Sequence, residues 1–174
     1  CTLAAVEDAV RRGADAVEVD LHRTADGAWI AMHDPTVDRT CDGTGAVRDL
    51  PLARLREFDA GYRFSPDGGV TFPWRGRGLR GPTLEEVALA SGSLGLSLEV
   101  KDEDPSALPG LVARLRDLPV AGRVGAGAFD HEVVLRLRAL APELATAASR
   151  REVRRFTALR RLGLGALHRD GAEV

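Results

Sequence analysis

The sequence predicts an α/β protein built on a (β/α)8 TIM-type barrel that is incomplete in this chain of 174 residues. Two observations favour this fold. Apolar strand patterns alternate with amphipathic helix patterns along most of the chain, which is typical of parallel βα units. No glycine signature of a dinucleotide-binding sheet accompanies them. A complete barrel takes about 250 residues, so we expect about five of its strands here, with the first and the last two missing.

The first predicted unit is a helix followed by an apolar strand. Residues 2–12 place apolar side chains at spacings of three and four after a capping residue, Thr2, and Gly13 ends the pattern. Strand 15–20 follows. Residues 28–33 come too soon afterwards for a helical crossover. We therefore expect them to return beside the strand as a short, hairpin-like arm.

Residues 34–82, here called the excursion, are rich in turn-forming residues and contain one short predicted helix, 52–58. A segment of this length with so little regular structure is typical of a functional loop. The arginines near its end, Arg75, Arg77 and Arg80, fit either an anion-binding rim or a solvated loop, and the solvated loop is favoured.

Regular alternation resumes after the excursion. Thr83 and Glu86 form a capping box that predicts the start of a helix. The later elements are predicted, in order, as strand 96–101, helix 106–117, strand 123–129, helix 131–140, a weak strand 144–148, helix 150–161 and a last strand 164–168.

The composition fits one globular domain over residues 1–174, with 44% hydrophobic and 29% charged residues. A net charge of −2 gives no basic footprint, which argues against a nucleic-acid partner. No apolar run is long enough for an integral membrane segment. The chain begins without methionine, so we expect a fragment, and its compartment (cytoplasmic or secreted) and oligomeric state stay open.

Two of the predicted strands end in charged side chains two residues apart. Glu18 and Asp20 belong to the first strand, and Glu99 and Lys101 to the strand after the next helix. Residues two apart in a strand point to the same side. A buried carboxylate is costly without a partner, and hard divalent cations prefer carboxylate oxygens. The pattern predicts a metal site, although either pair alone would also fit a solvated strand edge.

A histidine and a lysine extend this candidate site. His33 ends the arm, where it suggests acid–base chemistry beside a metal, although a lone histidine is more often structural. Lys101 is the only lysine among 24 basic residues, and the other 23 (24 − 1) are arginines. A compact ammonium that contacts phosphate is a reason to keep a lysine in such a chain. His22 is expected to face away from the acids.

Two residues near His33 have alternative interpretations. Asp34 either orients His33 or only starts a turn, and the turn is favoured. Arg39 either contacts substrate or forms a structural ion pair with Asp38 or Asp42.

The ordered set of motifs resembles the glycerophosphodiester phosphodiesterase family. No single motif is specific, but the set is, and it extends from residue 1 to about residue 148. The matching segments are Glu18-Val19-Asp20, Thr24-Ala25-Asp26-Gly27, His33-Asp34, the run from Asp34 to Gly45, Pro82-Thr83-Leu84-Glu85-Glu86 and Glu99-Val100-Lys101.

This resemblance implies a function for each candidate residue. Glu18, Asp20 and Glu99 would bind one divalent metal, Ca²⁺ or Mg²⁺. His33 would be one of two acid–base histidines, and Lys101 would hold the phosphate. The implied reaction is hydrolysis of a small-molecule glycerophosphodiester to glycerol 3-phosphate and an alcohol, which belongs to glycerol and lipid metabolism.

The chain also departs from the family pattern. The family opens with a His-Arg-Gly strand end followed by Glu-Asn-Thr, whereas this chain opens with Cys1-Thr2-Leu3. The family's Ser-Phe pair is Ala128-Phe129 here. Because the family's partner histidine belongs to the opening segment that is absent here, we expect the 174 residues alone to be inactive.

Two other functions fit the same residues. One is a lysophospholipase D-like or phospholipase-like phosphodiesterase, which needs an apolar mouth, and the excursion offers Phe64, Phe72 and Trp74. The other is a non-catalytic relative that binds metal or phosphate.

Overall fold

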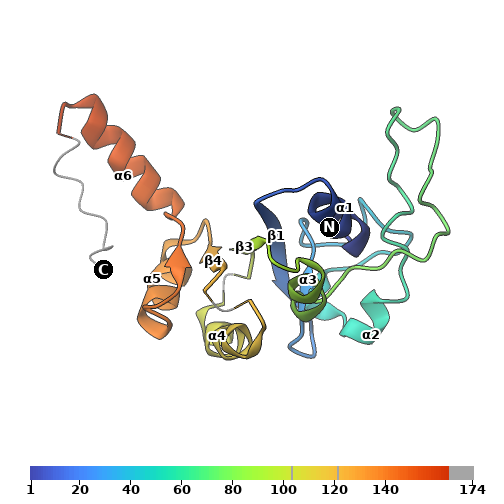
Figure 1. Cartoon of the computed structure of the whole chain (residues 1–174), viewed down its shortest axis with the longest axis horizontal. Coiled ribbons are helices and arrows are strands. Elements are labelled where there is room, and N and C mark those ends of the chain that lie inside the picture. The colour runs from blue at the N-terminus through green and yellow to red at the C-terminus, as the bar shows by residue number, and fades with distance from the viewer. Residues whose placement is uncertain (103, 121, 165–174) are drawn as a thin grey trace.

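The computed structural model describes residues 1–102, 104–120 and 122–164, and a five-stranded sheet lies at the centre of this part of the chain (Figure 1). The strand order is β2-β1-β3-β4-β5. β1 pairs in parallel with β3, β3 with β4 and β4 with β5, whereas β2 is antiparallel to β1. The strands are β1 (Ala16–Arg23), β2 (Trp29–Ala31), β3 (Gly95–Val100), β4 (Val124–Gly127) and β5 (Ala145–Thr146).

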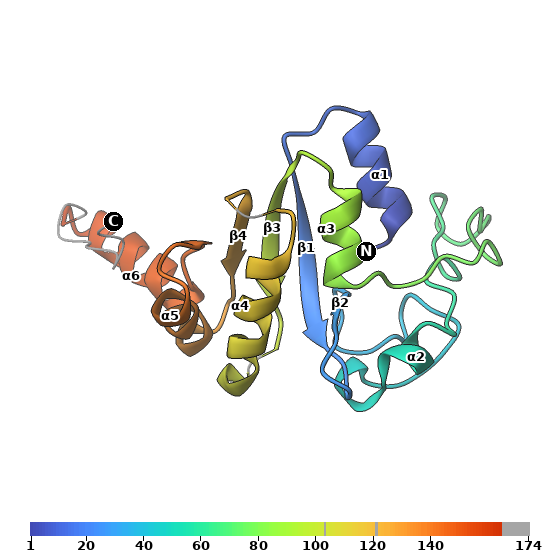
Figure 2. The same cartoon turned by 60° about the horizontal axis from the view of Figure 1, so that its bottom comes forward.

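Helices cover one face of this sheet, and Figure 2 shows α3 and α4 lying along the strands. The helices that alternate with the parallel strands are α1 (Leu3–Arg11), α3 (Leu84–Ala90), α4 (Leu108–Asp117), α5 (His131–Leu140) and α6 (Arg150–Arg161). A short 3-10 turn, Pro105–Ala107, precedes α4. None of the helices in the described ranges is both long and apolar enough to cross a membrane.

Capping residues set the helix starts, which confirms the predictions for Thr2 and for the Thr83–Glu86 capping box. The Thr2 and Asp130 side chains accept backbone N–H groups at the starts of α1 and α5. Complete capping boxes start α3 and α6, because the Thr83 and Ser149 hydroxyls accept a backbone N–H while the glutamate three residues later bonds back. Such caps satisfy backbone donors that would otherwise lack partners.

The main core fills the space between the helices and the sheet. Alternate residues of β1 and β3, such as Val19, Leu21 and Leu98, are buried there with apolar side chains of the helices. Glu18, Asp20 and Glu99 alternate with these residues, so they project from the opposite face. In a barrel that face is the interior.

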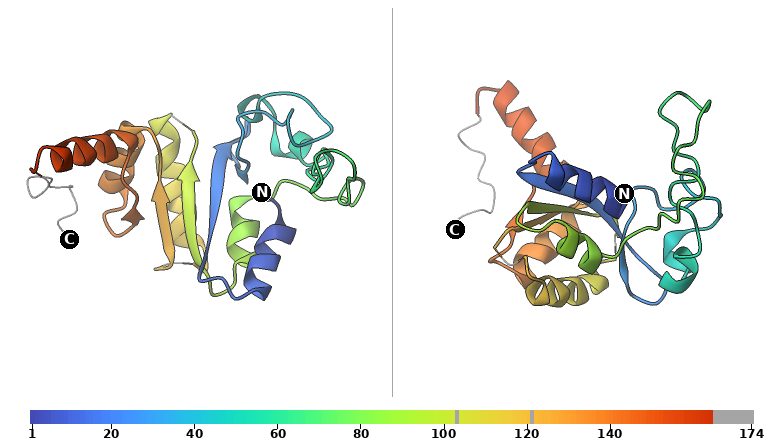
Figure 3. Two further views of the ribbon diagram at one scale, coloured as in Figure 1. Left: turned by 90° about the horizontal axis from the view of Figure 1, so that it is seen from above. Right: turned by 45° about the vertical axis from the view of Figure 1, so that its right-hand side comes forward.

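The excursion has a core of its own and lies beyond one edge of the sheet, while α6 lies beyond the other (Figure 3, left). Its regular elements are a 3-10 turn, Val47–Asp49, and α2 (Leu52–Leu55). The buried residues of this second core are Ile30, Met32, Val37, Cys41, Val47, Leu55 and Phe58.

Both ends of the excursion meet at β2. The Ala31 backbone N–H donates to the Pro82 carbonyl over 2.8 Å, and Ile30 forms an antiparallel bridge with Thr83. The excursion therefore starts and finishes at one place on the sheet.

The described elements match the predicted order with some changes of length. The arm is antiparallel to β1, as expected, but β1 extends to Arg23 because its last residues pair with the arm. The helix predicted at 52–58 is only α2, and β5 has two residues. The parallel βα order and the open sheet edges confirm an incomplete barrel. Residues 165–168 of the last predicted strand lie outside the described residues.

Candidate metal and phosphate site

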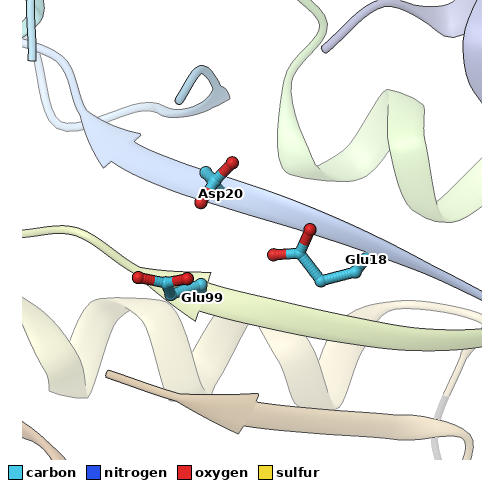
Figure 4. A group of neighbouring side chains, drawn as sticks. All are labelled: Glu18, Asp20 and Glu99. Carbon is cyan, nitrogen blue, oxygen red and sulfur yellow. The ribbon is translucent and has the colours of Figure 1, made fainter. Parts of the chain in front are cut away.

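Three carboxylates gather on two neighbouring parallel strands, on the face of the sheet opposite the main core (Figure 4). Asp20 of β1 stands opposite Glu99 of β3 in the strand register, and Glu18 lies two residues earlier on β1. One carboxylate oxygen from each residue lies within 4.8 Å of the others. Asp20 is buried, Glu99 is half-buried and Glu18 is exposed. The structure thus brings together the three acids that the sequence selected.

The electrostatics of this cluster favour a cation. Burial raises the pKa of Glu18, and the negative charges of Asp20 and Glu99 raise it further. Lys101 and His33 act in the opposite direction. Three oxygen donors at this spacing fit a hard divalent ion, whose charge would offset the repulsion between the carboxylates.

Lys101 lies directly on the acidic cluster. Its Nζ is 2.9 Å from Asp20 Oδ1 and also donates a hydrogen bond to Glu99. Burial by itself would lower the pKa of Lys101, but the hydrogen bonds to Glu99 and Asp20 outweigh it and raise the pKa. The predicted i, i+2 relation to Glu99 places the ammonium on the same face as the acids. A permanently charged ammonium beside a metal site is suited to binding phosphate oxygens.

His33 lies just beyond β2 and is exposed to solvent, with 67% of its side-chain surface accessible. Within the described residues it makes no hydrogen bond to the three acids, and its positive form acts on Glu18 through charge. It lines a cleft of about 1000 Å³ between α1 and the excursion. Glu18 borders a smaller depression of about 380 Å³ beside β1.

Asp34 connects His33 to Arg39. The Asp34 carboxylate lies 2.7 Å from His33 Nδ1 and accepts two hydrogen bonds from the Arg39 guanidinium. The hydrogen bonds from Arg39 and His33 hold the pKa of Asp34 well below its usual range. The favoured interpretation of Asp34 as only a turn residue was wrong, and so was the pairing of Arg39 with Asp38 or Asp42. The turn explained the presence of aspartate at position 34, and no sequence pattern indicated that Arg39, five residues later, would bond to it.

His22 is also placed differently from the expectation. Residues 18, 20 and 22 share one side of a strand, so His22 does not face away from the acids. Its Nε2 lies 3.3 Å from the backbone oxygen of His33. Burial lowers the pKa of His22 despite the nearby charge of Asp20. Correct use of the strand period would have found this residue.

The three aromatic residues considered for an apolar mouth, Phe64, Phe72 and Trp74, lie in different surroundings. Phe64 and Trp74 line the cleft beside His33. Phe72 instead packs against Arg75, whose guanidinium carbon lies 3.8 Å from the ring centroid. Arg75 also donates to the Tyr62 backbone oxygen, so it supports the loop itself.

Fold and site together define the class of this protein. It is a barrel-type α/β protein whose parallel strands carry a carboxylate cluster and a lysine on the interior face. The chain belongs to the glycerophosphoryl diester phosphodiesterase family, whose model matches residues 1–154.

Two curated relatives are both glycerophosphodiester phosphodiesterases. The protein from Caldanaerobacter subterraneus is 33% identical over 148 residues, which cover 82% of this chain and 58% of the relative. The protein from Bacillus subtilis is 33% identical over 159 residues, which cover 83% of this chain and 53% of the relative. The chain therefore spans a little over half the length of these relatives.

Solved structures have the same fold. A glycerophosphodiester phosphodiesterase from Agrobacterium tumefaciens matches with a TM-score of 0.70 and 30% identity, over 83% of this chain and 58% of that chain. An Oleispira antarctica phosphodiesterase in complex with the product sn-glycerol-3-phosphate matches with a TM-score of 0.70 and 27% identity, with the same coverage of both chains, 83% and 58%. A Mycobacterium tuberculosis domain of this family reaches a TM-score of 0.80 at 24% identity, over 94% of this chain and 59% of that chain.

Proposed function

We propose that the protein hydrolyses glycerophosphodiesters to glycerol 3-phosphate and an alcohol with the help of a divalent metal. The observation that carries this proposal is the cluster of Glu18, Asp20 and Glu99 with the Lys101 ammonium upon it. Its setting in a chain of this family supports a phosphoric diester as the substrate.

Glu18, Asp20 and Glu99 are the residues that would hold the metal, with Ca²⁺ or Mg²⁺ as the candidates. Their oxygens supply the hard donor set that both ions prefer. When bound, the ion supplies positive charge that stabilises the phosphate oxygens as charge develops on them.

Lys101 would bind a non-bridging phosphate oxygen of the substrate. Its ammonium is already held at the cluster by Asp20 and Glu99, so little reorganisation is needed when the substrate arrives. The same contacts fix the lysine in its charged form.

His33 would move a proton at Nε2. The Asp34 carboxylate favours the ring form that carries hydrogen on Nδ1, which leaves the lone pair of Nε2 available. Transfer of a proton at this atom, to the leaving alcohol or from the attacking oxygen, is the step that we assign to His33.

The test is an assay of glycerol 3-phosphate release from glycerophosphocholine and from glycerophosphoglycerol. It uses the protein from the complete open reading frame with Ca²⁺, with Mg²⁺ or with chelator, together with His33→Ala. Metal-dependent release that the variant loses supports the proposal. A folded wild-type protein that shows no activity with Ca²⁺ and none with Mg²⁺ contradicts the proposal. We expect the 174 residues alone to be inactive, and robust turnover by them would overturn that expectation.

The cleft beside His33 favours a second candidate, hydrolysis of lysolipids. Phe64 and Trp74 are exposed large apolar residues that line the cleft and offer a surface for an acyl chain. The same preparation, assayed with lysophosphatidylcholine and with glycerophosphocholine, separates the two activities. Failure with both substrates while metal binding is retained would indicate a non-catalytic relative.

A further inference from the structure

An exposed aromatic ring lies beside the proposed phosphate-binding lysine. Phe129 follows β4 by two residues, on the same face of the sheet as the acids, and 57% of its surface is exposed. The Nζ atom of Lys101 is 5.2 Å from the centroid of this ring. Since the same Nζ is 2.9 Å from Asp20, the ring borders the candidate site.

A second cation packs on this ring. The guanidinium carbon of Arg150 lies 4.6 Å from the Phe129 centroid. Arg150 is the first residue of α6, and its backbone N–H donates to the Phe129 carbonyl over 3.3 Å. This hydrogen bond fixes the backbone of Arg150 beside the segment that follows β4.

The guanidinium of Arg150 is available for a ligand. It belongs to none of the ion pairs found among residues 1–102, 104–120 and 122–164. The glutamate closest in sequence, Glu152, is bonded to Arg138 and to Ser149 instead. An exposed guanidinium that packs over an aromatic ring retains its N–H groups for an anion.

We propose that Arg150, supported by Phe129, recognises an anionic group on the alcohol part of the substrate. This inference rests on the proposed function and narrows its substrate class. The diester phosphate would lie at Lys101, and a carboxylate or second phosphate on the alcohol would reach Arg150 across the ring. A quaternary ammonium such as choline would meet two cations at the same ring, so its diester is the poorer substrate.

Arg150 and Lys101 bind the same kind of group, so the experiment must separate the headgroup anion from the diester phosphate. The substrates are glycerophosphoglycerol, glycerophosphocholine and a glycerophosphodiester whose alcohol carries a phosphomonoester. The variants are Arg150→Gln and, as the matched control, Arg151→Gln. Arg151 is an exposed arginine on the same helix, and its removal changes the net charge equally. All are made in the protein from the complete open reading frame.

We expect Arg150→Gln to lower kcat/KM for the phosphomonoester-bearing substrate by about tenfold, which is the scale of one charge-assisted hydrogen bond. Activity on glycerophosphoglycerol should stay within about twofold, and activity on glycerophosphocholine should stay the same or rise, because one of the two cations at the ring is removed. Arg151→Gln should leave all three unchanged. Equal loss on all three substrates would mean that Arg150 binds the diester phosphate, and no loss would mean that it binds nothing. Either result overturns the inference.

A binding measurement keeps this test separate from the proposed function. Calorimetry gives the affinity of glycerol 1,3-bisphosphate for wild type, Arg150→Gln and Arg150→Lys, with melting curves to verify folding. About tenfold weaker binding to Arg150→Gln, with partial recovery in Arg150→Lys, supports the inference even in an inactive protein. Equal affinities overturn it. A wild type that cleaves no glycerophosphodiester refutes the proposed function instead.

Discussion

The Nδ1 atom of His33 lies 2.7 Å from Oδ1 of Asp34, and the same carboxylate is held from its other side by Arg39. The His33 side chain has two thirds of its surface exposed to solvent, so without this contact it would sample several rotamers. The contact with Asp34 therefore restricts the ring and its hydrogen position at little cost in burial.

Asp34→Ala should reduce kcat by about tenfold to a hundredfold, because a catalytic group displaced by about 1 Å loses activity on that scale. KM should change little, since the Asp34 carboxylate is already engaged by His33 and Arg39. Steady-state kinetics of the protein from the complete open reading frame provide the measurement. Asp49→Asn, which removes an exposed aspartate of the excursion, is the control. A rise in KM at constant kcat would contradict an orienting role.

Glu18→Gln, Asp20→Asn and Glu99→Gln should each weaken Ca²⁺ or Mg²⁺ binding by about tenfold or more, because each removes a charged oxygen donor. Calorimetric titration with both ions measures this. Glu85→Gln is the matched control, since Glu85 lies on α3 and pairs with Arg114 far from the cluster. Equal affinities in the variants and the control would place the metal elsewhere.

Lys101→Met should have opposite effects on the two ligands. Removal of the ammonium takes one positive charge from the cluster and makes its net charge more negative. The affinity for a divalent cation should therefore rise severalfold. The affinity for glycerol 3-phosphate should fall about tenfold, because a charge-assisted hydrogen bond is lost. Two titrations on one preparation provide both numbers. Parallel weakening of both ligands would show that Lys101 only supports the fold of the site.

Glu152 should contribute to stability in a pH-dependent way. Burial alone would raise the pKa of Glu152, but hydrogen bonds from Arg138 and Ser149 lower it to about 2 from an ordinary value of 4.5. A folded-state pKa below the unfolded one adds stability above about pH 4.5, and this stability is lost as the pH falls towards 2. A shift of this size corresponds to about 3 kcal/mol. We expect about 2 kcal/mol of it to contribute, because solvent at the exposed edges of both side chains screens the pair.

Glu152→Gln should therefore lower the free energy of unfolding by about 2 kcal/mol at pH 7 and by much less at pH 2.5. Urea denaturation at the two pH values measures this difference. Glu132→Gln, at the exposed start of α5, is the control and should have a small effect at both. A loss that is the same at both pH values would mean that the charge of Glu152 is not what stabilises α6.

The sequence predicted those parts of the molecule that depend on local spacing. The i, i+2 pairs Glu18–Asp20 and Glu99–Lys101 depend only on the strand period and on parallel pairing, and the structure brings all four together. Capping residues located the helix starts because their hydrogen bonds span three residues. Metal binding and catalysis by these residues remain predictions.

The contacts that were missed join residues that no local rule relates. Arg39 bonds to Asp34 across a turn of the excursion, although two other aspartates are closer in sequence. The second core likewise depends on long-range packing of scattered side chains, such as Cys41 and Phe58, in a segment that has almost no periodic pattern. The position of His22, in contrast, follows from the strand period, and it was missed because that period was misapplied.

The excursion leaves and rejoins the sheet at β2, where Ala31 is bonded to Pro82. Closing a loop of twice the length between fixed ends costs only about 0.6 kcal/mol more. Evolution can therefore lengthen, shorten or recombine this segment without shifting the strands that carry the carboxylates. The wall of the cleft beside His33 is thus an exchangeable module, and a graft between Asp42 and Gly81, which keeps Arg39 on Asp34, is the natural route to engineering a new selectivity.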